Sequence, residues 1–539
     1  MEAKTQNSPT DDIPTLNAGA SRTSTKSEKT GYRIASVFGR VNYNYQMKYL
    51  LSLVARYDGI SRLKDNRWGF FPGVSVGWNV TEEDFWKESK ISEVISNIKP
   101  RLSYGVNGNV NGIGNFDIYG IYKQIGAGNY DGATAYYNSS LINTGLRWEQ
   151  SRSFEAGLDL GFFNNRLSFI FDYYNRTTDD LLTDVNLPAY TGFSSMKTNL
   201  GKLRNSGFEM EVRANILSNA KGFNWEVSAN LTSVSNKVLK LPTSDKPFNQ
   251  IDGYEVAAGL YNPETGETPT KWIGGYREGG KLGDMVGYVQ NHIKANANMV
   301  IDEVANLYGP GMANEINPQT GVTYAESNGW KPIEPGDVCW EDINKDGKIN
   351  SLDRAVVGNI FPKVTGGFST TLSYKNWSLY ARFDYALGHT IYNDLKARSL
   401  GQYQGQFNII DKVHDTWSET NPDTDLPVFT YADQLNKKNI TRSNNGNTAV
   451  DNNSSRFYEK GDYLALREIT LSYSLPKKWI GKAGMQDASV YVTGQNLFYI
   501  TGYDGVSPEP AVSTVYGRGI DNGRYPTPRT LLFGLSVTF

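Results

Sequence analysis

The last stretch of the chain, residues 529–539 (RTLLFGLSVTF), decides the fold because its side chains alternate in character. Leu531, Phe533, Leu535, Val537 and Phe539 fall on one face, and mostly small or polar residues fall on the other. Side chains of a β-strand alternate with a period of two. The segment therefore predicts a strand with one continuous apolar face.

The same alternation recurs along the chain, in segments separated by turns. The clearest repeats lie at 154–162, 167–174, 208–216, 223–232 and 377–385, and similar segments start near Val37, Tyr49, Pro72, Pro100, Gly366, Tyr463 and Ala488. With the closing strand they make about thirteen strands, each near the roughly ten residues that a tilted membrane-spanning strand needs.

The connections between these strands separate into two classes. Counting back from Phe539, every second connection is short or moderate, at 46–48, 81–99, 163–165, 218–221, 375–376 and 476–487. Most of the others are long, at 108–153, 177–206, 235–364, 389–462 and 501–528. Short periplasmic turns with long external loops are typical of outer-membrane barrels.

A soluble β-sandwich is the alternative, because its strands also alternate. Here, however, the polar faces carry Glu, Asp, Arg and Asn, which a wet barrel interior tolerates, and the opposite faces are rich in Phe, Trp, Tyr and Leu. A terminal phenylalanine on the last strand also resembles the closing strand of bacterial outer-membrane barrels. The sequence predicts an all-β fold, an antiparallel transmembrane β-barrel.

Composition excludes several other classes of protein. No apolar run approaches the length of a membrane-spanning helix. A net charge of -2 provides no basic face for nucleic acid. The one cysteine, Cys339, cannot form an internal disulfide, and the three histidines lie far apart in the sequence. No paired acid and base stands in a recognisable catalytic setting, so we expect no enzyme.

Several short segments match a known family. The chain resembles the SusC/RagA family of TonB-dependent outer-membrane transporters at 38–43 (FGRVNY), 68–72 (WGFFP), 101–105 (RLSYG), 146–149 (LRWE), 205–209 (NSGFE), 463–467 (YLALR), 493–498 (TGQNLF) and 525–529 (YPTPR). These matches run in order from about residue 30 to the end. The resemblance implies a location in the outer membrane and TonB-coupled import of glycans, oligosaccharides or peptides. It also implies a SusD-like surface lipoprotein as partner.

The chain departs from that family pattern in its first residues. A plugged transporter barrel has roughly 22 strands, and neither a plug domain nor a signal peptide is recognisable before the first strand here. We expect residues 1–31 to be the polar remnant of an external loop, and residues 32–539 to be the carboxy-terminal part of a barrel. TonB would then act only through a plug missing from this chain. The alternative is a surface binding or adhesion protein on a passive barrel scaffold.

One motif has the residue types and spacing of a metal-binding loop. In the external insertion 235–364, residues 342–353 (DINKDGKINSLD) follow the plan of a calcium-binding loop. Asp342, Asn344 and Asp346 would offer side-chain oxygens, Lys348 its carbonyl, and Asn350 a direct or water-mediated contact. Position 12 is Asp353 in place of the usual glutamate, as in dockerin-type loops. The alternative is a loop of Asx turns without a metal. A structural Ca²⁺ is the expectation, with no catalytic cofactor.

Overall fold

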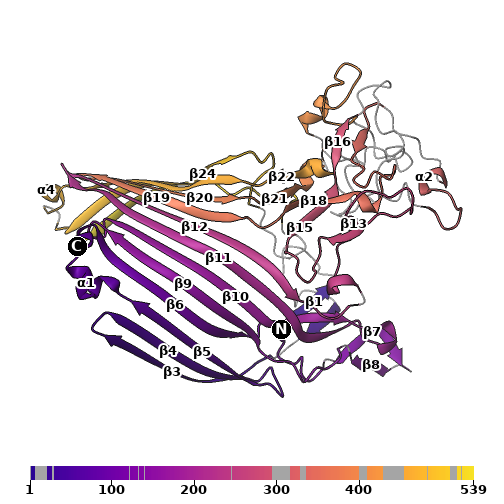
Figure 1. Cartoon of the computed structure of the whole chain (residues 1–539), viewed down its shortest axis with the longest axis horizontal. Helices are drawn as coiled ribbons and strands as arrows, with labels where there is room; N and C mark the ends of the chain where they lie inside the picture. The colour runs from indigo at the N-terminus through magenta and orange to yellow at the C-terminus, as the bar shows by residue number, and fades with distance from the viewer. Residues whose placement is uncertain are drawn as a thin grey trace.

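The computed structural model is built around one antiparallel sheet of thirteen strands (Figure 1). The structure describes residues 2–6, 21–26, 30–120, 122–130, 133–138, 140–244, 246–293, 316–327, 335–397, 399, 410–428, 454–481, 484–509, 519–523 and 525–539. In chain order the strands of the sheet are β3 (Ile34–Tyr45), β4 (Tyr49–Ile60), β5 (Trp68–Trp78), β6 (Ile95–Asn109), β9 (Glu149–Phe162), β10 (Leu167–Asn186), β11 (Ser195–Ala220), β12 (Phe223–Lys240), β19 (Val364–Tyr374), β20 (Trp377–Leu387), β23 (Tyr463–Ser474), β24 (Asp487–Thr501) and β26 (Thr530–Thr538). Each strand between the two edge strands β3 and β26 pairs with the previous and the next of this series, so the predicted strand number and antiparallel order are confirmed.

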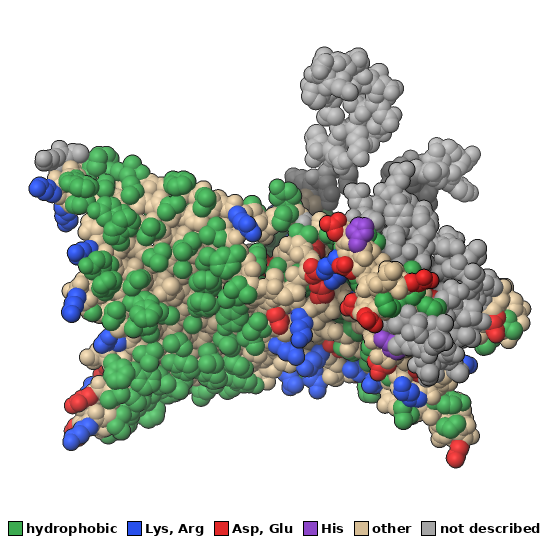
Figure 2. Space-filling model, turned by 90° about the horizontal axis from the view of Figure 1, so that it is seen from above, with side chains coloured by type: hydrophobic (Ala, Val, Ile, Leu, Met, Phe, Trp, Pro, Cys, Tyr) green, Lys and Arg blue, Asp and Glu red, His purple; other side chains and the backbone are tan. Residues whose placement is uncertain are grey.

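The outer face of the sheet is apolar, as the alternation predicts. On β26, the side chains of Leu531, Phe533 and Leu535 are 67%, 82% and 66% exposed, and the terminal Phe539 is 77% exposed. Figure 2 shows hydrophobic side chains covering this part of the molecule as a broad band. Such a surface is stable only against another apolar medium, as the hydrocarbon layer of a membrane provides.

The two ends of the sheet carry connections of different length. At one end, which we call the turn end, the connections span 46–48, 79–94, 163–166, 221–222, 375–376 and 475–486. At the opposite end they span 61–67, 110–148, 187–194, 241–363, 388–462 and 502–529. The predicted long loops in 110–148, 241–363, 388–462 and 502–529 are therefore confirmed, whereas 61–67 and 187–194 are shorter than the connections 79–94 and 475–486 of the turn end.

One expected loop proves to be mostly strand. Residues 177–206 form the continuation of β10 and β11, which pair as far as Asn186 and Ser195 and leave only 187–194 as the connection. The register shifts near Thr178 and Leu181, where Asp180 adopts a φ of 58°. A β-bulge of this kind lets pairing continue past a break in the alternation. The break in the pattern made these residues look like a loop.

The long connections fold into a small β-rich body, here called the external lobe: the described parts of 241–363, 388–462 and 502–529. Its strands are β13 (Tyr254–Ala257), β14 (Thr270–Ile273), β15 (Asp284–Tyr288), β16 (Gln290–Ile293), β17 (Val338–Trp340), β18 (Arg354–Asn359), β21 (Thr390–Asn393), β22 (Tyr458–Lys460) and β25 (Ile520–Asp521). Strands β21, β22 and β25 come from two different connections and form one sheet, so the lobe joins loops that are distant in sequence.

Three buried apolar clusters hold the lobe together. One contains Tyr288, Val338, Trp340 and Ile349, packed against Trp417. The others are Met285, Tyr392, Ala397 and Phe457, and Val256, Ile273 and Val286. Burial of these side chains stabilises the lobe because apolar surface leaves water.

The remaining elements are short. Hairpin β7 (Tyr122–Tyr130) and β8 (Ala133–Asn138) lies in the connection after β6, and β1 (Glu2–Gln6) pairs with β2 (Ser21–Lys26). Most of the expected external remnant, 1–31, lies outside the described residues. Helices of three or four residues are α1 (Asp84–Lys87), α2 (Tyr324–Ser327), α3 (Asp394–Lys396) and α4 (Lys477–Ile480). Within the described residues, no helix is long and apolar enough to cross a membrane.

Candidate functional site

The inner face of the sheet carries a cross-strand cluster of charges. Arg101 on β6 donates from Nε and Nη2 to Oδ1 of Asp159 on β9, at 2.9 and 2.7 Å, and from Nη2 to Asp172 on β10, at 3.1 Å. A guanidinium suits this role because its planar fork reaches two carboxylates at once. All three side chains are partly exposed, which limits the stabilisation that the ion pairs contribute.

A glycine makes room for this cluster. Gly157 pairs with both Arg101 and Asp172 across the sheet, and an added Cβ would lie 2.3 Å from Oδ1 of Asp172 and 2.8 Å from Cζ of Arg101. Only a residue without a side chain lets the guanidinium lie flat against the wall between the two carboxylates.

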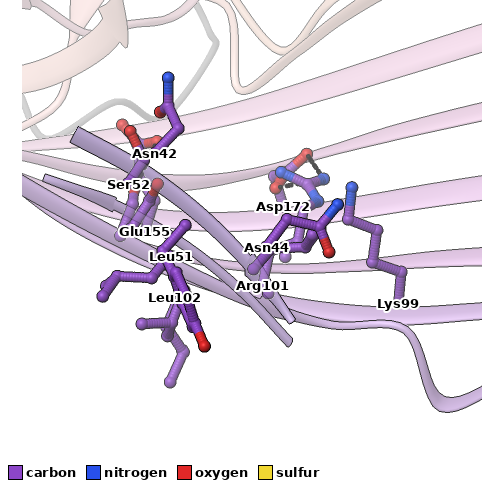
Figure 3. Close-up of a pocket in the computed structure, with 16 residues that line it drawn as sticks. Asn42, Asn44, Leu51, Ser52, Lys99, Arg101, Leu102, Glu155 and Asp172 are labelled. Atoms are coloured by element: carbon purple, nitrogen blue, oxygen red, sulfur yellow. Dashed lines mark hydrogen bonds and ion pairs between the residues drawn. The ribbon is translucent and has the colours of Figure 1, made fainter. Parts of the chain in front are cut away.

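A cavity of about 390 Å³ lies beside this cluster (Figure 3). Its polar lining includes Asn42, Ser52, Lys99, Arg101, Glu155 and Asp172, from strands β3, β4, β6, β9 and β10. The wall thus offers both donors and acceptors, which can hold a polar ligand or a polar protein segment by hydrogen bonds.

A second charged cluster joins the far wall to the external lobe. Arg467, in a bulge of β23, pairs with Asp384 of β20 and with Glu509 of the connection after β24. It also donates from Nη1 to the hydroxyl of Tyr499 at 3.0 Å. One arginine therefore ties an external loop to the inner face of the barrel wall.

Ion pairs also link two external connections to each other. Lys396 lies 2.9 Å from Glu459 and 3.0 Å from Asp504, and Lys412 pairs with Asp504 as well. The hydrogen bond from Lys412, followed by contacts with Lys396, lowers the pKa of Asp504 below its ordinary value. The backbone amide of Asp504 donates to Glu459 at 3.0 Å, so the contact is held by main chain as well as side chains.

The calcium-type loop, residues 342–353, connects β17 to β18 and is anchored at both ends. Ile349, at the eighth position, is fully buried in the cluster with Tyr288 and Trp340. Gly347, at the sixth position, has a φ of 80°, a left-handed conformation that favours glycine. The predicted turn geometry of the loop is therefore present.

The oxygens of the loop already order its backbone. Asp342 accepts from the amide of Gly347 at 2.9 Å, and Asp346 accepts from that of Lys348 at 2.8 Å. The Nδ2 amides of Asn344 and Asn350 face Oδ2 of Asp346 at 3.0 and 3.5 Å. The Oδ1 atom of Asn344 accepts from the amide of Asp346 at 3.2 Å, and that of Asn350 accepts from the amide of Leu352 at 2.8 Å, so both asparagine oxygens face the loop backbone.

Asp353, at position 12, orders the backbone of the loop. Its two oxygens accept from the amides of Ile343 and Asn350 at 2.9 and 2.8 Å. Burial raises the pKa of Asp353 to about 7, against the lowering effect of these hydrogen bonds, and Asp342 and Asp346 raise it further.

The donor set of the loop is compatible with a hard cation. Asp342 is 3% exposed and Asn344 and Asp353 are 0% exposed. Among the described residues, none of the three loop carboxylates forms an ion pair with lysine or arginine, so only hydrogen bonds offset the charge of the buried Asp342 and Asp353. In the same part of the chain no three His, Cys, Asp or Glu side chains are arranged to hold a metal by themselves. A cation here would depend on the asparagine oxygens and the Lys348 carbonyl as well.

An apolar outer band, a charged inner wall and loops of unequal length define an outer-membrane β-barrel protein. The family model described as TonB dependent receptor-like, beta-barrel, matches residues 3–283. The chain belongs to this family, whose members are receptors and transporters and not a class of enzymes.

Relatives and solved structures agree with this assignment. TonB-dependent receptor P3 of Formosa agariphila is 32% identical over 517 residues, covering 94% of this chain and 45% of that protein. TonB-dependent receptor SusC of Bacteroides thetaiotaomicron is 30% identical, covering 95% and 45%. The RagAB peptide transporter structure superposes with a TM-score of 0.70 at 24% identity, covering 98% of this chain and 50% of that chain. The chain thus spans about half the length of the curated relatives it matches.

The sequence pointed to the calcium-type loop. The structure places the six predicted residues in one connection, with Asp342, Asn344 and Asp353 buried, Asp346 and Asn350 half-buried and Lys348 exposed. The sequence did not reveal Arg101, Asp159 and Asp172 as a cluster, because they lie on three strands. A signal existed, since the tight connection 163–166 sets the register that places Asp172 opposite Gly157.

Replacing Gly157 with alanine should destabilise the barrel wall by about 1 kcal/mol, because the methyl group displaces Arg101 from its two carboxylates. The measurement is the temperature at which the heat-modifiable band unfolds on a gel. Gly105→Ala is the matched control, since an added Cβ at this inner-face glycine has no neighbour within 4 Å. Equal unfolding temperatures for the two variants would contradict the proposed crowding.

The lobe contact at Asp504 should weaken in acid. A carboxylate whose pKa is lowered by folding stabilises the folded state at pH values above the pKa of the unfolded chain. This stabilisation is lost as the pH falls through the pKa of the folded state, here below about pH 4. Hydrogen exchange of the amides around Asp504, corrected for the intrinsic rate, should therefore accelerate below that pH. Asp504→Asn should remove the pH dependence, and an unchanged dependence in this variant would refute the assignment.

Proposed function

We propose that these residues form the carboxy-terminal part of the barrel of a TonB-coupled nutrient importer for glycans, oligosaccharides or peptides. The observation that carries the proposal is the thirteen-stranded sheet itself, whose outermost strands β3 and β26 each have one neighbour among the described strands. Further strands would complete the wall, since an unpaired strand edge in lipid leaves backbone groups without partners.

The charged inner wall supports import better than passive anchoring. A polar solute, or a polar domain that moves within the barrel, needs such a lining. TonB would act through a plug domain supplied outside these residues, and a SusD-like lipoprotein would cover the external lobe.

The test is uptake by cells with and without this gene. Labelled oligosaccharides and labelled peptides are each offered, with a protonophore to dissipate the inner-membrane energy in a parallel culture. We expect uptake of one ligand class to fall at least tenfold on deletion and to the same level with the protonophore. A surface adhesion protein would instead lose cell-surface binding on deletion, with uptake unchanged, and that result would refute import.

We also propose that the calcium-type loop holds a structural Ca²⁺ through Asp342, Asn344, Asp346, Asn350 and the Lys348 carbonyl, with Asp353 supporting the loop or joining the ligands. Two buried carboxylates without a basic partner favour a cation at this place. A bound Ca²⁺ would stabilise the connection between β17 and β18 and through Ile349 the core of the lobe.

Calcium binding to the purified chain, measured by calorimetry, should weaken at least tenfold in Asp342→Asn and in Asp346→Asn. Glu341→Gln is the matched control because Glu341 is adjacent, exposed and outside the ligand pattern. Calcium should also slow proteolysis within the lobe of the unmodified chain and of the control. No calcium binding by the unmodified chain, or equal affinities in all three variants, would rule the site out.

A further inference from the structure

The turn end of the sheet is divided electrostatically. From β9 to β24, its described connections contain basic residues and no aspartate or glutamate, at 163–166, 221–222, 375–376, 475–481 and 484–486. We call these basic residues the basic rim: Arg166, Lys221, Lys375, Lys477 and Lys478. All five are exposed. Figure 2 shows Lys and Arg side chains spaced along this end, beyond the hydrophobic band.

The other part of the same end is different. The connection 79–94 carries five acidic residues, Glu82, Glu83, Asp84, Glu88 and Glu93. Two lysines are paired with these acidic residues, since Lys48 of the neighbouring turn lies 3.1 Å from Glu83 and Lys87 lies 2.8 Å from Glu82. In the basic rim, by contrast, no lysine or arginine forms an ion pair with any described residue. The positive charge of the rim is therefore available to a partner.

A row of aromatic side chains lies directly beside the basic rim on the outer face. Phe223 stacks on Tyr374 with ring centroids 4.1 Å apart, and Trp377 lies 4.7 Å from Tyr473. These four rings sit opposite one another across strands β12, β19, β20 and β23. Trp479, in α4 beside Lys478, is 62% exposed. Aromatic belts of this kind lie at the level of lipid headgroups.

The two observations together identify the partner. We propose that the basic rim binds the anionic headgroups of phospholipids in the membrane leaflet that faces the turn end. Lysine suits this role because its long stem reaches from the apolar band to the headgroup level while the ammonium stays in water. Arg166 contributes less to headgroup binding, because its Nη2 already donates to the carbonyls of Asn215 and Ile216.

The spacing of the rim favours lipid over a protein partner. The five basic residues lie in four separate connections, which together join eight neighbouring strands. Each residue lies beside outward-facing apolar side chains. A protein would need an extended acidic face following the circumference of the barrel, whereas headgroups surround the barrel on all sides. The acidic connection 79–94 should carry no such lipid, which makes the proposed shell one-sided.

The experiment compares two variants of the full chain in which four exposed lysines become glutamine. The rim variant is Lys221→Gln, Lys375→Gln, Lys477→Gln and Lys478→Gln. The control variant, with the same change of net charge at the opposite end, is Lys240→Gln, Lys246→Gln, Lys271→Gln and Lys281→Gln. Each protein is reconstituted in phosphatidylcholine vesicles that contain a minor fraction of brominated phosphatidylglycerol, and quenching of tryptophan fluorescence is compared with that by brominated phosphatidylcholine.

We expect the unmodified chain and the control to prefer phosphatidylglycerol at least tenfold, because each lysine near an anionic surface contributes about fivefold before screening. The rim variant should lose most of this preference. An equal loss of the phosphatidylglycerol preference in both variants would show that only net charge matters. No preference in the unmodified chain would indicate an acidic protein as the partner. Either result overturns the proposal.

A measurement on the unmodified chain keeps the proposal testable if the rim variant does not fold. At about 1 M salt the screening length falls to about 3 Å. The preference for phosphatidylglycerol should then disappear, and a preference that persists at that ionic strength would also overturn the proposal.

Discussion

A backbone amide in the hydrocarbon layer of a membrane has no water to bond with, and this constraint accounts for most of the structure. Every strand from β4 to β24 in the large sheet pairs on both sides, so its amides and carbonyls are satisfied by neighbours. Once the backbone is paired in this way, side chains must alternate between lipid and barrel interior. The apolar band, the charged inner wall and the placing of irregular segments at the two ends all follow.

The constraint also explains what the sequence predicts well. Alternation is local, so strands such as β20 and β26 are recognisable residue by residue, and their order follows from the turns. Prediction from alternation fails where strand pairing continues past a bulge, as at Asp180, because the change of face looks like the end of a strand. The calcium-type loop is predictable for the same reason as the strands, because the spacing of its candidate ligands lies within one short segment. The metal itself stays a prediction.

Contacts between distant segments are a different matter. The buried cluster of Met285, Tyr392 and Phe457 draws on two external connections that no local pattern relates. Arg467 and Glu509 meet only because a bulge in β23 turns one side chain toward a returning loop. Such pairs depend on the register of the whole sheet, and a single sequence does not contain that information in any one window.

The overhanging hairpin of β10 and β11 has a mechanical consequence. These strands contain 20 and 26 residues, whereas about ten cross the membrane, so roughly half of the hairpin stands above the lipid. The bulge at Asp180 lies near the point where the strands emerge, and Arg147 braces it at 2.6 Å. Leu182 packs against the buried cluster that contains Val110, Ile113 and Leu146, and Lys197 donates to the carbonyl of Gly112 at 2.6 Å. The overhang is therefore fastened to the connection 110–148, and a force applied at 187–194 passes into that connection as well as into the strands.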